Sequence, residues 1–93
     1  MGINEFAGIV KQKILDKMDG LKEVQIKRVL KNNNVLLTGI VIIEEEGSNM
    51  HPVIYLEQYF SMYELGMPMD DVVYHVVMAC YRACMERDKK IIT

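Results

Sequence analysis

The sequence lacks the apolar stretches that carry a protein into or across a membrane. Its longest apolar run is NVLLTGIVII, well short of the roughly 18–20 residues that span a bilayer. The opening MGINEFAGIVKQK has no basic segment followed by an apolar stretch and a small-residue cleavage site, so it does not resemble a signal peptide. We therefore expect a cytoplasmic protein without a membrane segment.

Neither sign of charge dominates, and cysteine is scarce. The formal net charge of −2 gives the whole molecule no strong attraction for phosphate backbones or anionic membranes. The two cysteines, Cys80 and Cys84, are four residues apart in a predicted helix, where a disulfide would fit poorly and a reducing cytosol would oppose it. We expect buried thiols that act as small apolar side chains, with a metal or redox role as the alternative.

Motifs of catalysis and cofactor binding are also missing. The sequence has no Gly-rich phosphate loop, no Ser-His-Asp arrangement and no carboxylate pair with an assignable cleft. A zinc site that combines histidine with the cysteines is not feasible, because His75 projects from the side of its helix opposite Cys80 and Cys84. We therefore expect neither an enzyme nor a cofactor or metal site.

The residues that are present follow the pattern of one small domain, 1–93. Half of them (51%) are hydrophobic and 26% are charged, as in globular proteins of this size. Residues 3–18 repeat apolar side chains at helical spacing, and residues 21–31 alternate as in a strand. Arg28 interrupts the apolar face of that strand, which predicts a bulge or a sheet edge there.

Two further strands are predicted from the middle of the sequence. Residues 35–43 are apolar on both faces, as in a central strand, and Gly39 within them predicts the close approach of another backbone or of a helix. A third strand is expected over 51–56. The asparagines at 32–34 predict a tight hairpin turn, and residues 44–49 predict a polar loop.

Two helices complete the predicted fold. A short helix is expected within 57–66, where it ends at a glycine, and a long helix contains residues 70–90. The result is an α+β domain with the order helix, three-stranded antiparallel meander, short helix, long C-terminal helix. Because helices and sheets pack in layers around one apolar core, we expect the helices on one face of the sheet.

The long helix carries more apolar surface than one core needs. At 100° per residue, its valines and cysteines fill an arc suited to lie on a sheet. Four large side chains extend that arc without a polar break, and we call them the Tyr/Met stripe: Tyr74, Met78, Tyr81 and Met85. The whole apolar arc covers roughly two-thirds of the circumference, against the roughly 100° of an ordinary surface helix. Either the other helices of the chain cover the stripe, or another molecule does.

The stripe predicts a non-enzymatic protein-interaction module that self-associates, as a homodimer, or docks a protein partner. Tyr and Met are enriched in interface cores, and Met adapts to irregular partners. We expect Met62 and Tyr63 of the short helix to extend the contact.

Nucleic-acid binding is a weaker alternative. Lys27 and Lys31 share one predicted strand face, and Lys13 and Lys17 would strengthen a basic patch if they lay nearby. Because no aromatic side chain is interleaved with these lysines, the stacking that RNA-binding sheets use is missing. A solvated outer sheet face is the default expectation.

The sequence also resembles a known family. The residues that carry the resemblance are Lys31-Asn32-Asn33, Thr38-Gly39, Pro52-Val53-Ile54-Tyr55-Leu56, and then Tyr59, Phe60 and Tyr63. They are similar to the N-terminal module of an uncharacterised family, a domain of unknown function common in anaerobic gut Firmicutes. That family has no established activity, so the resemblance implies no catalytic or binding residue.

Family members often continue past this module, whereas the present sequence ends at KKIIT. Either the sequence is part of a longer protein, or it is a small stand-alone protein for which a phage or mobile element is a plausible source. Small acidic proteins of that kind often block a host defence enzyme. The second functional hypothesis is therefore an anti-CRISPR-like inhibitor of a bacterial defence nuclease, with Glu44, Glu45 and Glu46 in a basic groove.

Overall fold

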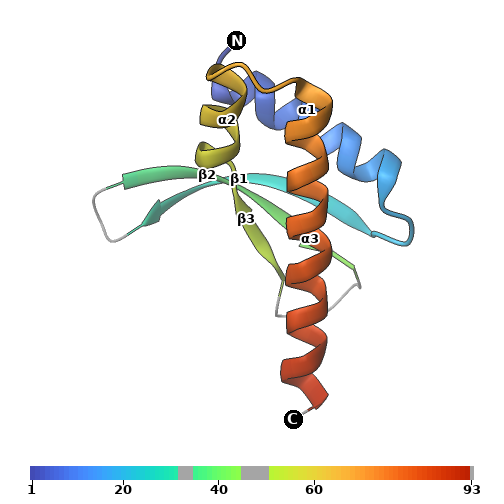
Figure 1. Ribbon diagram of the computed structural model, residues 1–93. Coiled ribbons are helices and arrows are strands. Elements are labelled where there is room, and N and C mark those ends of the chain that lie inside the picture. Colours follow the sequence, from blue (N-terminus) through green and yellow to red (C-terminus); the bar gives the residue numbers. More distant parts are fainter. Residues whose placement is uncertain (32–34, 45–50, 93) are drawn as a thin grey trace.

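The chain folds in the order that the sequence predicts. The computed structural model describes residues 1–31, 35–44 and 51–92, with side-chain surroundings up to residue 85 and not for residue 31. Helix α1 (Ile3–Lys17) is followed by strands β1 (Glu23–Lys31), β2 (Val35–Ile43) and β3 (Val53–Tyr55), then by helices α2 (Glu57–Glu64) and α3 (Met69–Ile92) (Figure 1). The predicted hairpin turn at 32–34 and most of the polar loop lie outside the described residues. The predicted α+β class is confirmed.

The sheet is antiparallel, and β2 is its central strand. β1 pairs with β2 without interruption, from Glu23 opposite Ile43 to Lys31 opposite Val35. The expected bulge at Arg28 is therefore absent, and the other expectation, a sheet edge, is correct. β3 pairs only with the Gly39–Val41 part of β2, so the β1–β2 hairpin continues as a two-stranded ribbon beyond it.

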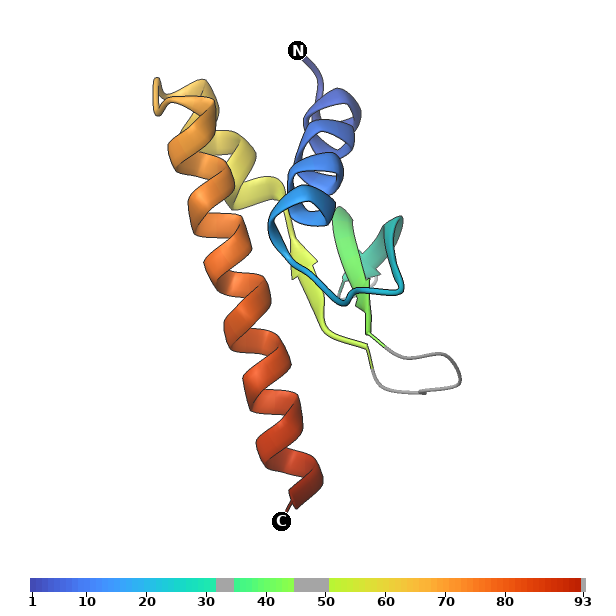
Figure 2. The same cartoon turned by 90° about the vertical axis from the view of Figure 1, so that its right-hand side faces the viewer.

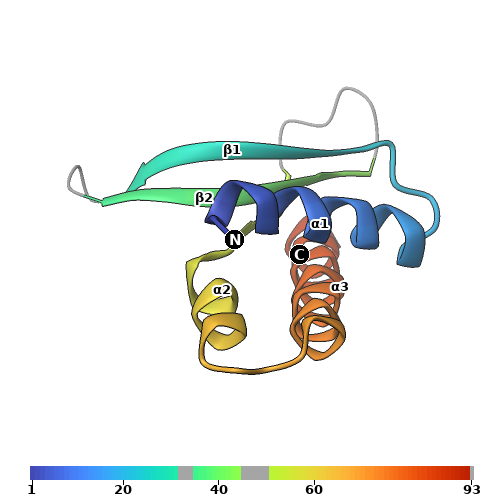
Figure 3. The same cartoon turned by 90° about the horizontal axis from the view of Figure 1, so that it is seen from above.

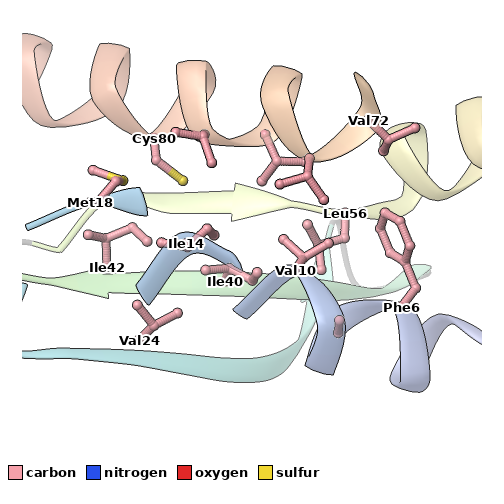
Figure 4. Close-up of a cluster of buried hydrophobic side chains, with 14 of the residues drawn as sticks. Phe6, Val10, Ile14, Met18, Val24, Ile40, Ile42, Leu56, Val72 and Cys80 are labelled. Carbon is pink, nitrogen blue, oxygen red and sulfur yellow. The ribbon is translucent and has the colours of Figure 1, made fainter. Parts of the chain in front are cut away.

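All three helices lie on the same face of the sheet (Figure 3). α1 packs on β1 and β2, α3 packs on α1 and on β3, and α2 packs against α3. The inner face of the sheet contributes Val24, Ile40 and Ile42, which alternate with residues of the outer face because successive side chains of a strand point to opposite sides. Figure 4 shows these residues enclosed by Phe6 and Ile14 of α1 and by α3.

The junction of β3 and α2 depends on one carboxylate. Leu56 donates its N–H to the Thr38 carbonyl of β2 at 2.9 Å, but its own carbonyl accepts the N–H of Phe60 in the first turn of α2. The Thr38 N–H would otherwise have no acceptor, and Glu57 Oε2 accepts it at 2.7 Å. The Glu57 side chain thus takes the place that a strand carbonyl would hold and lets the chain leave the sheet.

Of the two expectations for Gly39, the close approach of a helix is not found, and the neighbour is strand β3. Gly39 lies on the outer face of the sheet, between Ile40 and Thr38 of the inner face, and the helices cover the inner face only. A Cβ at this position would lie 3.1 Å from Val53 Cγ1 and 3.7 Å from Tyr55 Cδ1. The glycine therefore allows two side chains of β3 to pack over β2.

The thiols are buried in the core, as expected. Cys80 and Cys84 are both free and buried, and Cys80 lies near Met18 and Ile42 (Figure 4). Removal of water from the Cys80 thiol disfavours its charged form, which raises its pKa from the ordinary value of 9.0 to about 12.

We predict that Glu57→Ala lowers the free energy of unfolding by about 1–3 kcal/mol, because it leaves the Thr38 N–H buried without an acceptor. Urea unfolding followed by circular dichroism measures this change. The matched control is Gln58→Ala, at the exposed neighbouring position of the same helix turn, which should change stability by less than about 0.5 kcal/mol. Equal effects of the two substitutions would contradict the role given to Glu57.

Because the pKa of the Cys80 thiol is raised, we predict that the folded protein loses stability at alkaline pH. The folded state holds this proton more tightly than the unfolded chain, so stability that is fully present below pH 9 falls as the pH rises towards 12. By about pH 10 the protein should have lost roughly 1 kcal/mol more than Cys80→Val, which has no titrating group there. Urea unfolding of both proteins at several pH values measures the difference, and parallel pH curves would show that the thiol does not contribute.

Candidate protein-interaction site on helix α3

Helix α3 buries only part of its apolar surface. One side of the helix is enclosed by α1, α2 and β3, and it consists of Val72, Val73, Val76, Val77, Cys80 and Cys84. The sequence assigns this valine and cysteine side to the sheet. Its burial is confirmed, but the side meets the sheet mainly at β3 and otherwise packs against α1 and α2.

The Tyr/Met stripe stays partly exposed. Tyr74 and Met85 are 60% and 59% exposed, and Met78 and Tyr81 are 39% and 43% exposed. Met78 and Tyr81 are thus more than half buried, and the end of α1 touches Tyr81, whereas Tyr74 and Met85 are mostly in solvent. Of the two alternatives that the sequence leaves open, the chain's own helices therefore cover the stripe only in part.

The direction of the stripe follows from helix geometry. The buried residues of α3 occupy an arc of about 140° and the stripe an adjoining arc of about 60° at 100° per residue. The centre of the stripe thus lies about 140° around the axis from the centre of the buried side. In Figure 2, α3 runs along the outer side of the helical layer, so a side that points away from the core faces solvent.

Two side chains of the stripe, Tyr81 and Tyr74, make contacts within the domain. The hydroxyl of Tyr81 donates to the Lys17 carbonyl at the end of α1, at a long 3.5 Å. The ring of Tyr74 meets that of His75 edge-on, with 5.9 Å between the ring centroids. His75 and Arg82 are exposed and form the polar strip beside the stripe.

Met62 and Tyr63, which the sequence predicts to extend the contact, are partly buried and pack against the core. The centroid of the Tyr63 ring lies 6.1 Å from that of Phe6 and 6.5 Å from that of Phe60. The centroids of the Phe6 and Phe60 rings are 5.3 Å apart. This aromatic cluster joins α1 to α2. The sequence could not show this, because the same apolar spacing on a short helix serves a core or a surface.

The lysine candidates whose side chains are described lie on two different sides of the sheet. Lys27 lies opposite Gly39 on the outer face of the sheet, whereas Lys13 and Lys17 belong to α1 on the other side of the sheet. Lysines of both elements therefore do not meet in one basic patch. Of the acidic residues, Glu44 is partly buried, and Glu45 and Glu46 lie outside the described residues.

A small hollow lies at the corner of β2, β3 and α2. It has a volume of about 360 Å³, and its lining consists of Leu37, Val53, Ile54, Tyr55, Glu57, Gln58 and Tyr59. Glu57 already accepts the Thr38 N–H through one oxygen, while its other oxygen and the Thr38 hydroxyl are buried without a hydrogen-bond partner among the described residues. One carboxylate in a mostly apolar lining does not make an acid–base pair.

A second exposed apolar surface was not predicted from the sequence. Leu30 and Leu36 lie opposite each other near the end of the β1–β2 hairpin, and they are 57% and 48% exposed although they share the inner face with the core. The end of the β1–β2 hairpin extends past β3, which pairs only with Gly39–Val41, and past the helices (Figure 1). The predicted lengths of the first two strands, 21–31 and 35–43, against the shorter third strand, 51–56, were the signal for this overhang.

Within the part of the chain that the structure describes, no group of three or more His, Cys, Asp and Glu residues could hold a metal ion. His75 is exposed while Cys80 and Cys84 are buried on another side of α3. In the same residues, no helix has the length and apolar character needed to cross a membrane.

Comparison with known proteins agrees with the resemblance seen in the hairpin and in the third strand. No curated protein and no solved structure matches the chain. Residues 3–93 match the family of unknown function DUF5688, and this match covers α1, the whole sheet, α2 and α3. The chain therefore belongs to the family of unknown function DUF5688.

Proposed function

We propose that this protein is a non-enzymatic interaction module that binds a protein partner through the Tyr/Met stripe of α3. The observation that carries the proposal is the exposure of all four side chains, 39–60%, on a helix whose other apolar side is already fully used by the core. Contiguous apolar surface that stays exposed is a feature of interaction sites.

The chemistry of the stripe supports a helical partner. Tyrosine buries a large ring at a low cost in side-chain entropy, and methionine adapts its shape to the surface it meets. A second amphipathic helix laid along the stripe would contact all four side chains at once, since they follow one line on α3. The exposed His75 and Arg82 would form one polar rim.

The size of the stripe sets the expected strength of binding. Four side chains of roughly 200 Å² each, at the observed exposures, leave roughly 400 Å² to be buried. At 25 cal/mol per Å² this corresponds to about 10 kcal/mol, which is within the range of the cost of association itself. The stripe alone therefore supports reversible binding, and tighter binding needs contacts around it.

The other hypotheses have less support from the geometry. A basic patch for nucleic acid would require lysines on one surface, but Lys27 and Lys17 are separated by the sheet. Inhibition of a defence nuclease rests on Glu44–Glu46, of which only Glu44 is described. The cytoplasmic location, the bacterial or phage source and the distribution among gut Firmicutes stay predictions.

We predict that a photo-crosslinking amino acid in place of Met78 gives a discrete protein adduct, and that the captured partner, once purified, binds the unmodified chain. Met78→Glu should weaken that binding about 10-fold or more, because it buries a charge in the apolar contact. Isothermal titration calorimetry measures the affinity, and circular dichroism confirms that the variant is folded.

The control is Lys27→Glu, which introduces the same carboxylate at an exposed position on the outer face of the sheet, away from all three helices, and should change the affinity less than about threefold. A crosslinker at Lys27 should give little of the adduct. Equal crosslinking from both positions, or equal weakening by both substitutions, would show that the stripe is not the binding surface.

A further inference from the structure

We infer that the partner of the Tyr/Met stripe is a second copy of this chain, with the two α3 helices packed antiparallel about a two-fold axis near residue 79. This inference rests on the proposed function and names its partner. The spacing, the self-complementarity, the direction and the area of the stripe support a second copy.

The stripe has the spacing of a helix–helix seam. Tyr74, Met78, Tyr81 and Met85 are separated by four, three and four residues. This is the alternation of the two core positions of a coiled coil, where apolar residues recur every 3.5 residues on average. Side chains at this spacing stay on the side of the helix that faces another helix, for a length of about 16 Å.

An antiparallel pair makes the stripe complementary to itself. When two copies align with Met78 opposite the partner's Tyr81, Tyr74 comes opposite the partner's Met85. Each contact layer then pairs one flat ring with one flexible thioether, which attract each other. A parallel pair would instead place Tyr opposite Tyr and Met opposite Met. A two-fold axis requires the same patch on both copies, and this patch meets the requirement.

The direction of α3 leaves room for the second copy. The stripe points about 140° away from the buried side of its helix, and α3 lies on the outer side of the helical layer (Figure 2). A helix packed 8–10 Å away on that side, the usual distance between helix axes, lies outside α1, α2 and the sheet. The end of α1 touches the edge of the stripe, where Tyr81 meets the Lys17 carbonyl.

The area makes this a weak and reversible dimer. Two stripes bury roughly 800 Å² in total, below the roughly 1,200–2,000 Å² of stable interfaces. We expect a dissociation constant of roughly tens to hundreds of micromolar, so that the chain is monomeric when dilute and dimeric when concentrated.

Sedimentation equilibrium from about 10 µM to about 1 mM measures this equilibrium. The expected result is a mass that rises from that of one chain towards that of two, with a dissociation constant raised about 10-fold or more by Met78→Glu and changed less than about threefold by Lys27→Glu on the outer face of the sheet. A mass that stays monomeric throughout overturns the inference, as does a dimer that Met78→Glu leaves unchanged.

Spin labels determine the orientation in a background of Cys80→Val and Cys84→Val, once its fold and dimerisation are shown to match those of the unmodified chain. In the antiparallel pair, labels at Asp71 lie roughly 30 Å apart and labels at Arg82 roughly 15 Å apart, because the first position is far from the axis and the second is close to it. Similar short distances at both positions indicate a parallel pair and overturn the inference.

The crosslinking experiment separates this inference from the function on which it rests. A monomeric chain that still gives a Met78 adduct with a different protein overturns the second copy as partner and leaves the interaction module intact. A monomeric chain without any adduct that depends on Met78 overturns both.

Discussion

Burial of one face of the three-stranded sheet is the constraint on which the rest of the structure depends. The uninterrupted pairing of β1 with β2 places Val24, Ile40 and Ile42 on a single face. That apolar face must be covered, and α1 and α3 both come to lie on it. α1 lies next to the sheet, α2 and α3 lie on the same side of it, and no helix of the described residues covers the other face (Figure 3).

The exposure of the Tyr/Met stripe is a consequence of this packing. A helix can present only part of its circumference to a sheet and to its neighbours, and α3 presents its valines and cysteines. Since the apolar arc is wider than the covered part, the side chains next to it are left outside. The surface proposed for binding is thus produced by the requirement to form the core, without any special element devoted to it.

The polar and apolar contacts at the end of β3 have a structural role. Val53 and Tyr55 pack over Gly39, and the Glu57 carboxylate closes the end of the β2–β3 pairing by taking up the Thr38 N–H. These features finish the short third strand and stabilise the turn into α2. They differ from the stripe, whose four side chains remain 39–60% exposed.

The sequence by itself determined the elements, their order, the central position of β2 and the two sides of α3, because helix and strand periodicities sort side chains locally. It could not decide whether Tyr63 and Tyr74 are core or surface, since both lie on apolar arcs of helices. Only the tertiary structure decided this, by packing Tyr63 against Phe6 and leaving Tyr74 in solvent. Such a choice depends on which elements meet, and residues 57 positions apart in the sequence meet only when the chain has folded.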